Sequence, residues 1–230
     1  MKEIKIKGFE TTLTFEEGAV NVLEVHDKKL FSQVVYNFIK SERTKAYGEE
    51  YLLIKDNKVM DMYQNILVIQ DFYQVDFNNP KILKKIYEQL QRDYDQEFDE
   101  KDKLEHWKGL LIITKDLLME YPFEFEMKDE VYFMEWLKFV GVKFNREHYD
   151  CPLINLTTLF EVNATLNLFE IIILVNVKSY FESEELSEIY KLALYNQSSL
   201  LLIEHYPDQL KRVYEKKLII DCDFDEQVIK

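Results

Sequence analysis

Glycine and proline are scarce in this sequence, with 5 and 4 residues in 230. Because these two residues mark most tight turns, their scarcity predicts long regular elements joined by few sharp turns. Long apolar runs are also missing, since the longest one, Ile171 to Val175, is far too short to cross a bilayer. The amino-terminal "MKEIKIKGFE" has no apolar segment of the signal-peptide kind. We therefore expect a cytoplasmic protein that does not span a membrane.

Cysteine and histidine give little sign of a metal or catalytic centre. The two cysteines, Cys151 and Cys222, lie far apart without metal-type spacing, as expected of reduced thiols. The four histidines form no H-x-x-x-H pair, and His148 with Cys151 is a single H-x-x-C, too weak a pattern for zinc. No nucleophile and base stand out together. The sequence thus offers little for catalysis.

Basic residues are outnumbered by acidic ones, 29 against 43, which gives a formal net charge of −14. This balance argues against binding a polyanion over the whole surface, because nucleic-acid affinity rests largely on phosphate neutralisation. It leaves room for a local basic lining, and it suits a divalent cation as a bridge. The apolar fraction of 47% is ample for a packed core.

The pattern of apolar residues divides the chain into three parts. Residues 1–77 contain strand patterns and one helix, which follows Asp27 as its cap. Residues 78–165 have the apolar spacing of helices, with Asn79 and Pro80 opening the first of them and Gly141 placed to end a later one. Residues 166–230 return to strands. We expect a mostly helical insertion, 78–165, within a discontinuous core.

The last part contains a strand, a helix and a strand at 170–176, 183–195 and 199–204. Two near-continuous apolar strands joined by a helix indicate a parallel sheet covered on both faces. The tail "KKLIIDCDFDE" has the pattern of an edge strand, with Asp221, Asp223 and Asp225 on one solvated face. The predicted fold class is therefore α/β, with the helical insertion as an arm.

A nucleotide-hydrolase site is missing both of its halves. The turn that would cradle phosphate, "EVHDKKLFSQ" (24–33), contains no glycine, and no G-x-x-x-x-G-K-[ST] occurs in the chain. At the end of the strand 170–176, where an aspartate would hold magnesium, the residue is Asn176. The core is thus predicted to be a degenerate P-loop-NTPase-like sheet without hydrolase activity.

A second motif has the residues of a metal-dependent nuclease. "PDQLKRVYEKK" (207–217) contains Asp208, Glu215 and Lys217, which are the two carboxylates and the lysine of such a site. The spacing is short, and the segment has the pattern of a helical turn, so a chance match is favoured. A nuclease or a residual nucleotidase is kept as the alternative function.

Acidic residues cluster where a helix of the insertion begins. "YPFEFEMKDE" supplies Glu124, Glu126, Asp129 and Glu130 within seven residues. Such carboxylates can hold calcium, which takes 6–8 oxygen ligands in flexible geometry. The residues alone favour the simpler interpretation, that these acids only complement the helix dipole.

Four segments together resemble a known family, the CRISPR-associated type II-A spacer-acquisition proteins of the small ring-forming Csn family. The segments occur in the order of that family: "GAVNVLEVHDKKLFSQVVYNF" (18–38), "NILVIQDFYQVDFNNPKILKKIYEQL" (65–90), "FEFEMKDEVYFMEWLKFVGVKF" (123–144) and "LFEIIILVNVKSYFESEELSEIYKLALYNQSSLLLIEHYP" (168–207). The resemblance covers most of the chain, and residues 41–60, 95–120 and 208–230 match poorly.

The resemblance implies a non-enzymatic homotetrameric ring that binds the ends of double-stranded DNA, independent of sequence, in a basic channel. It also implies that calcium is bound. For the acidic cluster this favours metal binding over the helix-dipole interpretation, with these ligands: Glu124, Glu126, Asp129 and Glu130. The implied partners are the CRISPR integrase and the RNA-guided effector nuclease.

Candidate DNA-binding residues come from two places. Lys138 and Lys143 in "WLKFVGVKF" match basic positions of the family, and Lys28 and Lys29 are placed to face phosphate at the start of a helix. A third hypothesis, beside the ring and the nuclease, is a structural protein whose acidic face binds basic partners.

Overall fold

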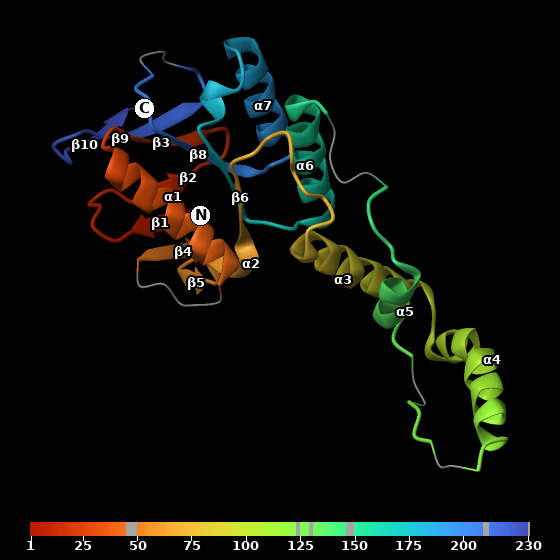
Figure 1. Ribbon diagram of the computed structural model, residues 1–230. Helices are drawn as coiled ribbons and strands as arrows, with labels where there is room; N and C mark the ends of the chain where they lie inside the picture. The colour runs from red at the N-terminus through yellow and green to blue at the C-terminus, as the bar shows by residue number, and fades with distance from the viewer. Residues whose placement is uncertain (45–49, 123–124, 129–130, 146–149, 209–211, 230) are drawn as a thin grey trace. The chain divides into compact units, whose positions relative to one another are not determined.

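The computed structural model describes residues 1–44, 50–122, 125–128, 131–145, 150–208 and 212–229 (Figure 1). The chain forms two compact units, of which the first comprises Met1–Asp76 with Arg146–Lys230 and the second comprises Phe77–Asn145. Secondary structure is mixed, with helices and both parallel and antiparallel strands, so the α/β class predicted from the sequence is confirmed. None of the helices within these ranges is long and apolar enough to span a membrane.

The first unit contains a six-stranded sheet in the order β10-β9-β3-β8-β7-β6 (Figure 1). Five of its strands are parallel, and β10 pairs antiparallel with β9. The strands are β3 (Val20–Val25), β6 (Ile66–Ile69), β7 (Ile171–Val175), β8 (Ser199–Glu204), β9 (Glu215–Ile220) and β10 (Glu226–Ile229). All residues of β3 and β7 are buried, as expected of parallel strands covered on both faces.

A smaller antiparallel sheet, in the order β2-β1-β4-β5, completes the strands of this unit. Its members are β1 (Lys2–Ile6), β2 (Leu13–Phe15), β4 (Tyr51–Lys55) and β5 (Lys58–Met60). Apolar side chains of this sheet, such as Ile4 and Leu53, pack in one core with Leu23 and Val25 of β3. The two sheets are therefore joined by a shared core.

Helices cover the two faces of the large sheet. Helix α1 (Lys28–Arg43) contributes Val34 and Phe38 to the core beside Leu23 and Val25. Helix α7 (Ser183–Tyr195) lies on the other face. Its Tyr190 contacts Glu215, which is in register with Val20, and the side chain of Val20 points away from the face that carries Leu23 and Val25. The remaining helices of the unit are α2 (Met62–Asn65), the short 3₁₀ helix η1 (Val177–Ser179) and α6 (Pro152–Leu166).

The second unit consists of three helices, α3 (Pro80–Glu97), α4 (Glu100–Met119) and α5 (Phe133–Val140). Asn79 caps α3 by accepting from the N–H of Lys81 at 2.9 Å, with Pro80 at the first helical position, as the sequence predicted. Gly141 ends α5 with φ of 70°, which confirms its predicted role as a left-handed cap. Helix α5 packs on α3, where the rings of Tyr94 and Phe133 stack with centroids 4.3 Å apart.

In the structure the helical unit ends at Asn145 and not at the predicted residue 165, because α6 belongs to the first unit. Asn163, which is buried, accepts from the N–H of Phe169 at 2.8 Å and donates to Ser198 Oγ at 3.3 Å. Leu156, Leu159 and Phe160 are fully buried. The apolar spacing predicts a helix in this segment, but tertiary packing determines that α6 belongs to the first unit.

Two expectations about the tail were wrong. The strand 215–220 is not an edge strand, because β10 turns back and pairs with it. Asp221, Asp223 and Asp225 do not share a strand face, since Asp221 Oδ1 accepts the backbone N–H groups of the other two, at 2.9 and 3.0 Å. These aspartates form the turn that allows β10 to fold back.

Asn163→Ala should destabilise the first unit by about 2 kcal/mol, because the buried N–H of Phe169 would lose its acceptor. Urea unfolding followed by circular dichroism measures this change. The matched control is Thr165→Ala on the exposed side of α6, which should stay within about 0.5 kcal/mol of wild type. Equal losses for the two variants would contradict the placement of α6.

Candidate functional site

Asn176 occupies the end of β7, where a nucleotide hydrolase would place its magnesium-holding acid. Its backbone is left-handed, with φ of 53°, a conformation that asparagine tolerates better than most residues. Its N–H donates to Ile203 O at 2.8 Å, and its Oδ1 accepts from the N–H of His205 at 3.1 Å. Asn176 thus ties the ends of β7 and β8 together, and its role here is structural.

The connection from β3 to α1 contains the other half of the absent nucleotide site. Asp27 accepts from the N–H of Leu30 at 2.8 Å. A helix amino terminus can bind an anion such as phosphate, but here the side chain of Asp27 fills that position. The turn therefore has neither the glycines nor the open N–H groups of a phosphate cradle.

A network of buried charges lies on the α7 face of the large sheet. Glu24 and Glu204 lie opposite each other on β3 and β8, and they are 1% and 3% exposed. Glu215 and Lys217 come from β9, and Lys178 follows β7 in η1. Within the described residues, the network contains four acids and three bases: Glu24, Glu204, Asp208, Glu215, Lys178, Arg212 and Lys217.

Lys178 is the centre of the network. Its Nζ lies 2.8 Å from Asp208 Oδ2 and 2.8 Å from Glu215 Oε1. Arg212 pairs with Asp208 and lies 3.6 Å from Glu215 Oε1. Lys217 lies 3.6 Å from Glu215 Oε2 and donates to the backbone oxygen of Asp208. Asp208 and Glu215 are each in contact with all three cations.

The structure corrects the expectation for "PDQLKRVYEKK". Glu215 and Lys217 lie on a strand and not in a helical turn, and Asp208 is brought next to them. Metal-dependent hydrolysis needs carboxylate oxygens that are free to bind the metal. Here both carboxylates are engaged by cations, and the described ranges contain no group of three or more His, Cys, Asp or Glu side chains that could hold a metal ion. The geometry therefore does not favour the nuclease alternative.

Burial changes the titration of two groups in this network. Loss of hydration raises the pKa of Glu204 to about 7. The backbone N–H and the charge of Lys178 lower this pKa, whereas the charges of Glu215 and Asp208 raise it further. Burial, together with the charge of Glu215, also raises the pKa of Tyr190. Tyr190 therefore stays a neutral phenol that donates to Glu215 Oε1 at 2.7 Å.

Lys28 and Lys29, predicted to contact DNA, are exposed in the first turn of α1. The structure adds two cations that the sequence reasoning missed, Lys40 and Arg43 in the last turn. Their spacing of 11 and 14 residues from Lys29 is close to three and four helical turns, which could have revealed them. The four cations lie on the exposed side of one helix.

The other predicted residues lie in the second unit. Lys138 on α5 and Lys143 beyond it are exposed. Of the predicted calcium ligands, Glu124, Asp129 and Glu130 lie outside the described residues, and Glu126 is exposed. The structure thus leaves the calcium site as a prediction.

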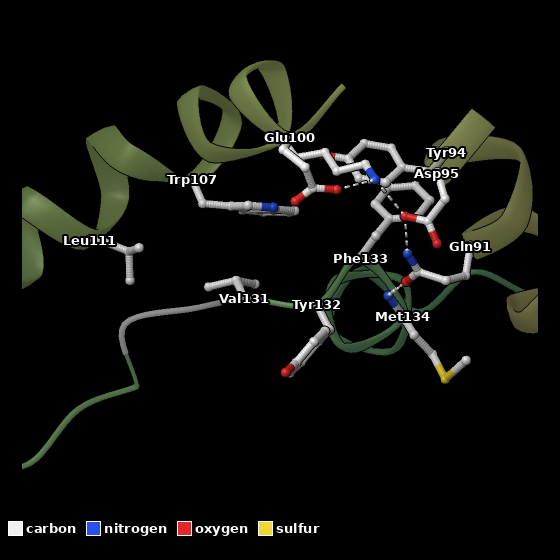
Figure 2. Close-up of a pocket in the computed structure, with 11 residues that line it drawn as sticks. Gln91, Tyr94, Asp95, Glu100, Trp107, Leu111, Val131, Tyr132, Phe133 and Met134 are labelled. Carbon is white, nitrogen blue, oxygen red and sulfur yellow. Dashed lines mark hydrogen bonds and ion pairs between the residues drawn. The ribbon is translucent and has the colours of Figure 1, made fainter. Parts of the chain in front are cut away.

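A pocket of about 550 Å³ within the second unit was not expected from the sequence (Figure 2). Tyr94 and Trp107 come to it from α3 and α4, and Phe133 comes from α5. Lys103, which also lines the pocket, pairs with Asp95 of α3 and Glu100 of α4 at 3.0 and 3.1 Å. The pocket depends on how the three helices pack together, so the periodicity of apolar residues alone did not reveal it.

Lys178→Met should destabilise the first unit by about 1.5–3 kcal/mol, because buried Glu215 and half-buried Asp208 would each lose one of their three cations. Lys216→Met removes a neighbouring cation whose partner, Glu16, is 59% exposed, and it should change stability by less than about 1 kcal/mol. Urea unfolding of both variants measures the difference. A Lys178 variant as stable as the Lys216 variant would show that the network contributes little.

The chain is similar to known proteins over most of its length. Residues 45–224 match the family described as CRISPR-associated protein (Cas_Csn2). CRISPR-associated protein Csn2 of Streptococcus agalactiae is 23% identical over 208 residues, which cover 88% of each chain. The crystal structure of Stu0660 of Streptococcus thermophilus has the same fold, with a TM-score of 0.60 at 13% identity, over 99% of this chain and 76% of that one. The resemblance found in the sequence is confirmed, and the chain belongs to the CRISPR-associated Csn2 family.

Proposed function

We propose that this protein serves CRISPR adaptation by binding the ends of linear double-stranded DNA, without regard to sequence and without cleaving them. Family membership supports the role in adaptation. The observation that carries DNA binding is the exposed face of α1, which is basic and free of acids.

The basic face of α1 consists of exposed side chains spread over about 22 Å, at 1.5 Å per residue. It contains four cations, three neutral polar side chains and no carboxylate: Lys28, Lys29, Lys40, Arg43, Ser32, Gln33 and Tyr36. The only acid within the helix, Glu42, is buried. In a chain of net charge −14, such a face is a local exception of the kind that phosphate binding requires.

Lys40 and Arg43 suit the negative end of the helix dipole, but Lys28 and Lys29 are not explained by folding. Lys28 and Lys29 lie at the positive end of the helix dipole, where lysine is unfavourable by a few tenths of a kcal/mol or more. Among the described residues, none of the four cations lies within 4.0 Å of a carboxylate. The phosphates of a DNA backbone would supply the missing negative charge, and Tyr36 could stack on an unpaired terminal base.

Assembly into a homotetrameric ring is the second part of the proposal. Helix α4 has apolar residues on all sides, as is usual for a helix that is buried. Five of them are exposed: Leu110, Ile112, Ile113, Leu117 and Met119. A patch of this kind marks a protein contact, and a second copy of the chain would cover it. In a ring, Lys138 and Lys143 are proposed to join the face of α1 as DNA contacts.

Calcium enters the proposal through the acidic stretch Glu124, Glu126, Asp129 and Glu130. Carboxylates suit this ion, which we propose orders the arm and hence the assembly. The remaining partners are the CRISPR integrase and the RNA-guided effector nuclease, to which the bound DNA end would be passed.

Reversing two charges on the α1 face, Lys29→Glu with Lys40→Glu, should weaken binding of a linear duplex at least tenfold. The slope of log K against log salt should become less steep by roughly 2, since each lost phosphate contact removes about 0.9. Fluorescence anisotropy over a salt series measures both quantities, and closed-circular DNA tests the preference for ends.

The control has the same net charge but reverses lysines elsewhere in the first unit, Lys58→Glu with Lys191→Glu, both exposed. Its affinity should fall less than threefold. If the control loses as much affinity as the α1 variant, the long-range field and not the α1 face accounts for binding. Absence of binding to any DNA at low salt would refute the proposed function.

Leu117→Asp should reduce the assembly, because an exposed carboxylate would have to be buried at the contact between copies. Light scattering after gel filtration should give a tetramer for the wild type in calcium, and smaller species for the wild type in chelator and for Leu117→Asp. Lys108→Asp, at a polar exposed position of the same helix, is the matched control and should leave the assembly intact. A wild-type monomer in calcium would contradict the ring.

A further inference from the structure

Two buried carboxylates lie side by side at the carboxyl ends of β3 and β8. Glu24 and Glu204 are in register on parallel strands, so their side chains point to the same face of the sheet. Both are almost completely buried. Glu24 Oε1 lies 2.7 Å from His26 Nε2, and Glu24 Oε2 accepts from the N–H of Asp208 at 3.3 Å.

Glu204 differs from the other three acids of the buried network. Among the described residues no cationic side chain lies within 4.0 Å of its carboxylate, and its hydrogen bond is to the backbone N–H of Lys178, at 3.2 Å. Asp208 and Glu215 each contact three cations, and Glu24 contacts Lys217 at 4.0 Å. A buried carboxylate without a cation favours its protonated form.

Glu24 has another titratable neighbour, because His26 Nε2 lies against Glu24 Oε1. Within the described residues, Glu204 is the carboxylate of the pair that lacks a cation, so a proton bound here belongs to the pair and not to the imidazole.

We propose that Glu24 and Glu204 share one proton, and that loss of this proton above neutral pH loosens the edge of the sheet from which α1 begins. The pair is close to α1, because Glu24 contacts His26 and Asp27 then caps the helix. On the other face, His205 follows Glu204 and packs against Phe31 of α1, with ring centroids 5.1 Å apart.

The groups that face the pair determine how it titrates. Lys178 approaches from η1, Tyr190 from α7, Glu215 and Lys217 from β9, and Asp208 and Arg212 from the connection between β8 and β9. Burial raises the pKa of Glu204 to about 7, above that of an unfolded glutamate. The stabilisation from the bound proton is therefore complete below the unfolded value and is lost as the pH rises through about 7.

Carbon-13 NMR of protein labelled at the glutamate carboxyl carbons tests the shared proton directly. One carboxyl signal of the wild type should titrate with a midpoint near 7, and Glu204→Gln should remove that titration. The side-chain amide that this substitution introduces is neutral, as the protonated acid is, so the variant fixes the uncharged state of this position. If it fails to fold, Glu24→Gln removes the same pair from the other side.

Hydrogen exchange reports the loosening of the edge. After correction for the intrinsic rate, exchange in residues 22–31 should increase at least fivefold between pH 6 and 8.5 in the wild type and less than twofold in Glu204→Gln. Glu170→Gln is the control, because Glu170 is also largely buried but pairs with Lys2 and Lys55, which hold its pKa low despite burial. This control should keep the wild-type increase.

Three results would overturn the proposal. They are the absence of any glutamate carboxyl that titrates above pH 6 in the wild type, a titration that persists in both the Glu204 and the Glu24 variants, and an exchange increase that is equal in wild type and Glu204→Gln. A titration confined to the ring of His26 would place the proton outside the pair and would equally contradict it.

Discussion

The neutralisation of Asp208 and Glu215 by Lys178 is the interaction on which the α7 face of the large sheet depends. Buried charges are tolerated only when they are paired, because removing an ion from water costs several kcal/mol. Here the pairing uses the carboxylates that the nuclease alternative would need for a metal. At the carboxyl edge of the sheet, Asp27 fills the phosphate position and Asn176 replaces the metal-holding acid. An edge that in a nucleotide hydrolase performs chemistry thus holds the sheet together.

Function is then proposed to lie on exposed surfaces, and the exposed face of α1 is basic and free of acids. A net charge of −14 describes the average of the surface, whereas DNA binding depends on the charges within a Debye length of the phosphates, about 10 Å at 0.1 M salt. An acid-free helix face satisfies that local requirement. The exposed apolar residues of α4 require a different partner, since they would be covered by protein and not by DNA.

The sequence predicted those parts of the fold that depend on local pattern. The β7–α7–β8 unit followed from two apolar runs and an amphipathic helix, and the caps Asn79 and Gly141 followed from residue type. The buried network did not, because Lys178 and Glu215 meet only through the connections between strands. The helical pattern of α6 was predicted, but its unit was not, since two buried asparagines and three apolar side chains attach it. Lys40 and Arg43, the further cations on α1, could have been found from their helical spacing.

Photo-crosslinking at α1 tests the central claim, that DNA lies against this helix, most directly. A photoreactive phenylalanine analogue replaces Tyr36 on the α1 face, or Tyr195 at the end of α7 as control; both tyrosines are exposed, at 61% and 85%. Illumination with a linear duplex should crosslink DNA to the protein substituted at 36, and salt that abolishes binding should abolish the crosslink. Crosslinking at 195 with none at 36 would contradict the account.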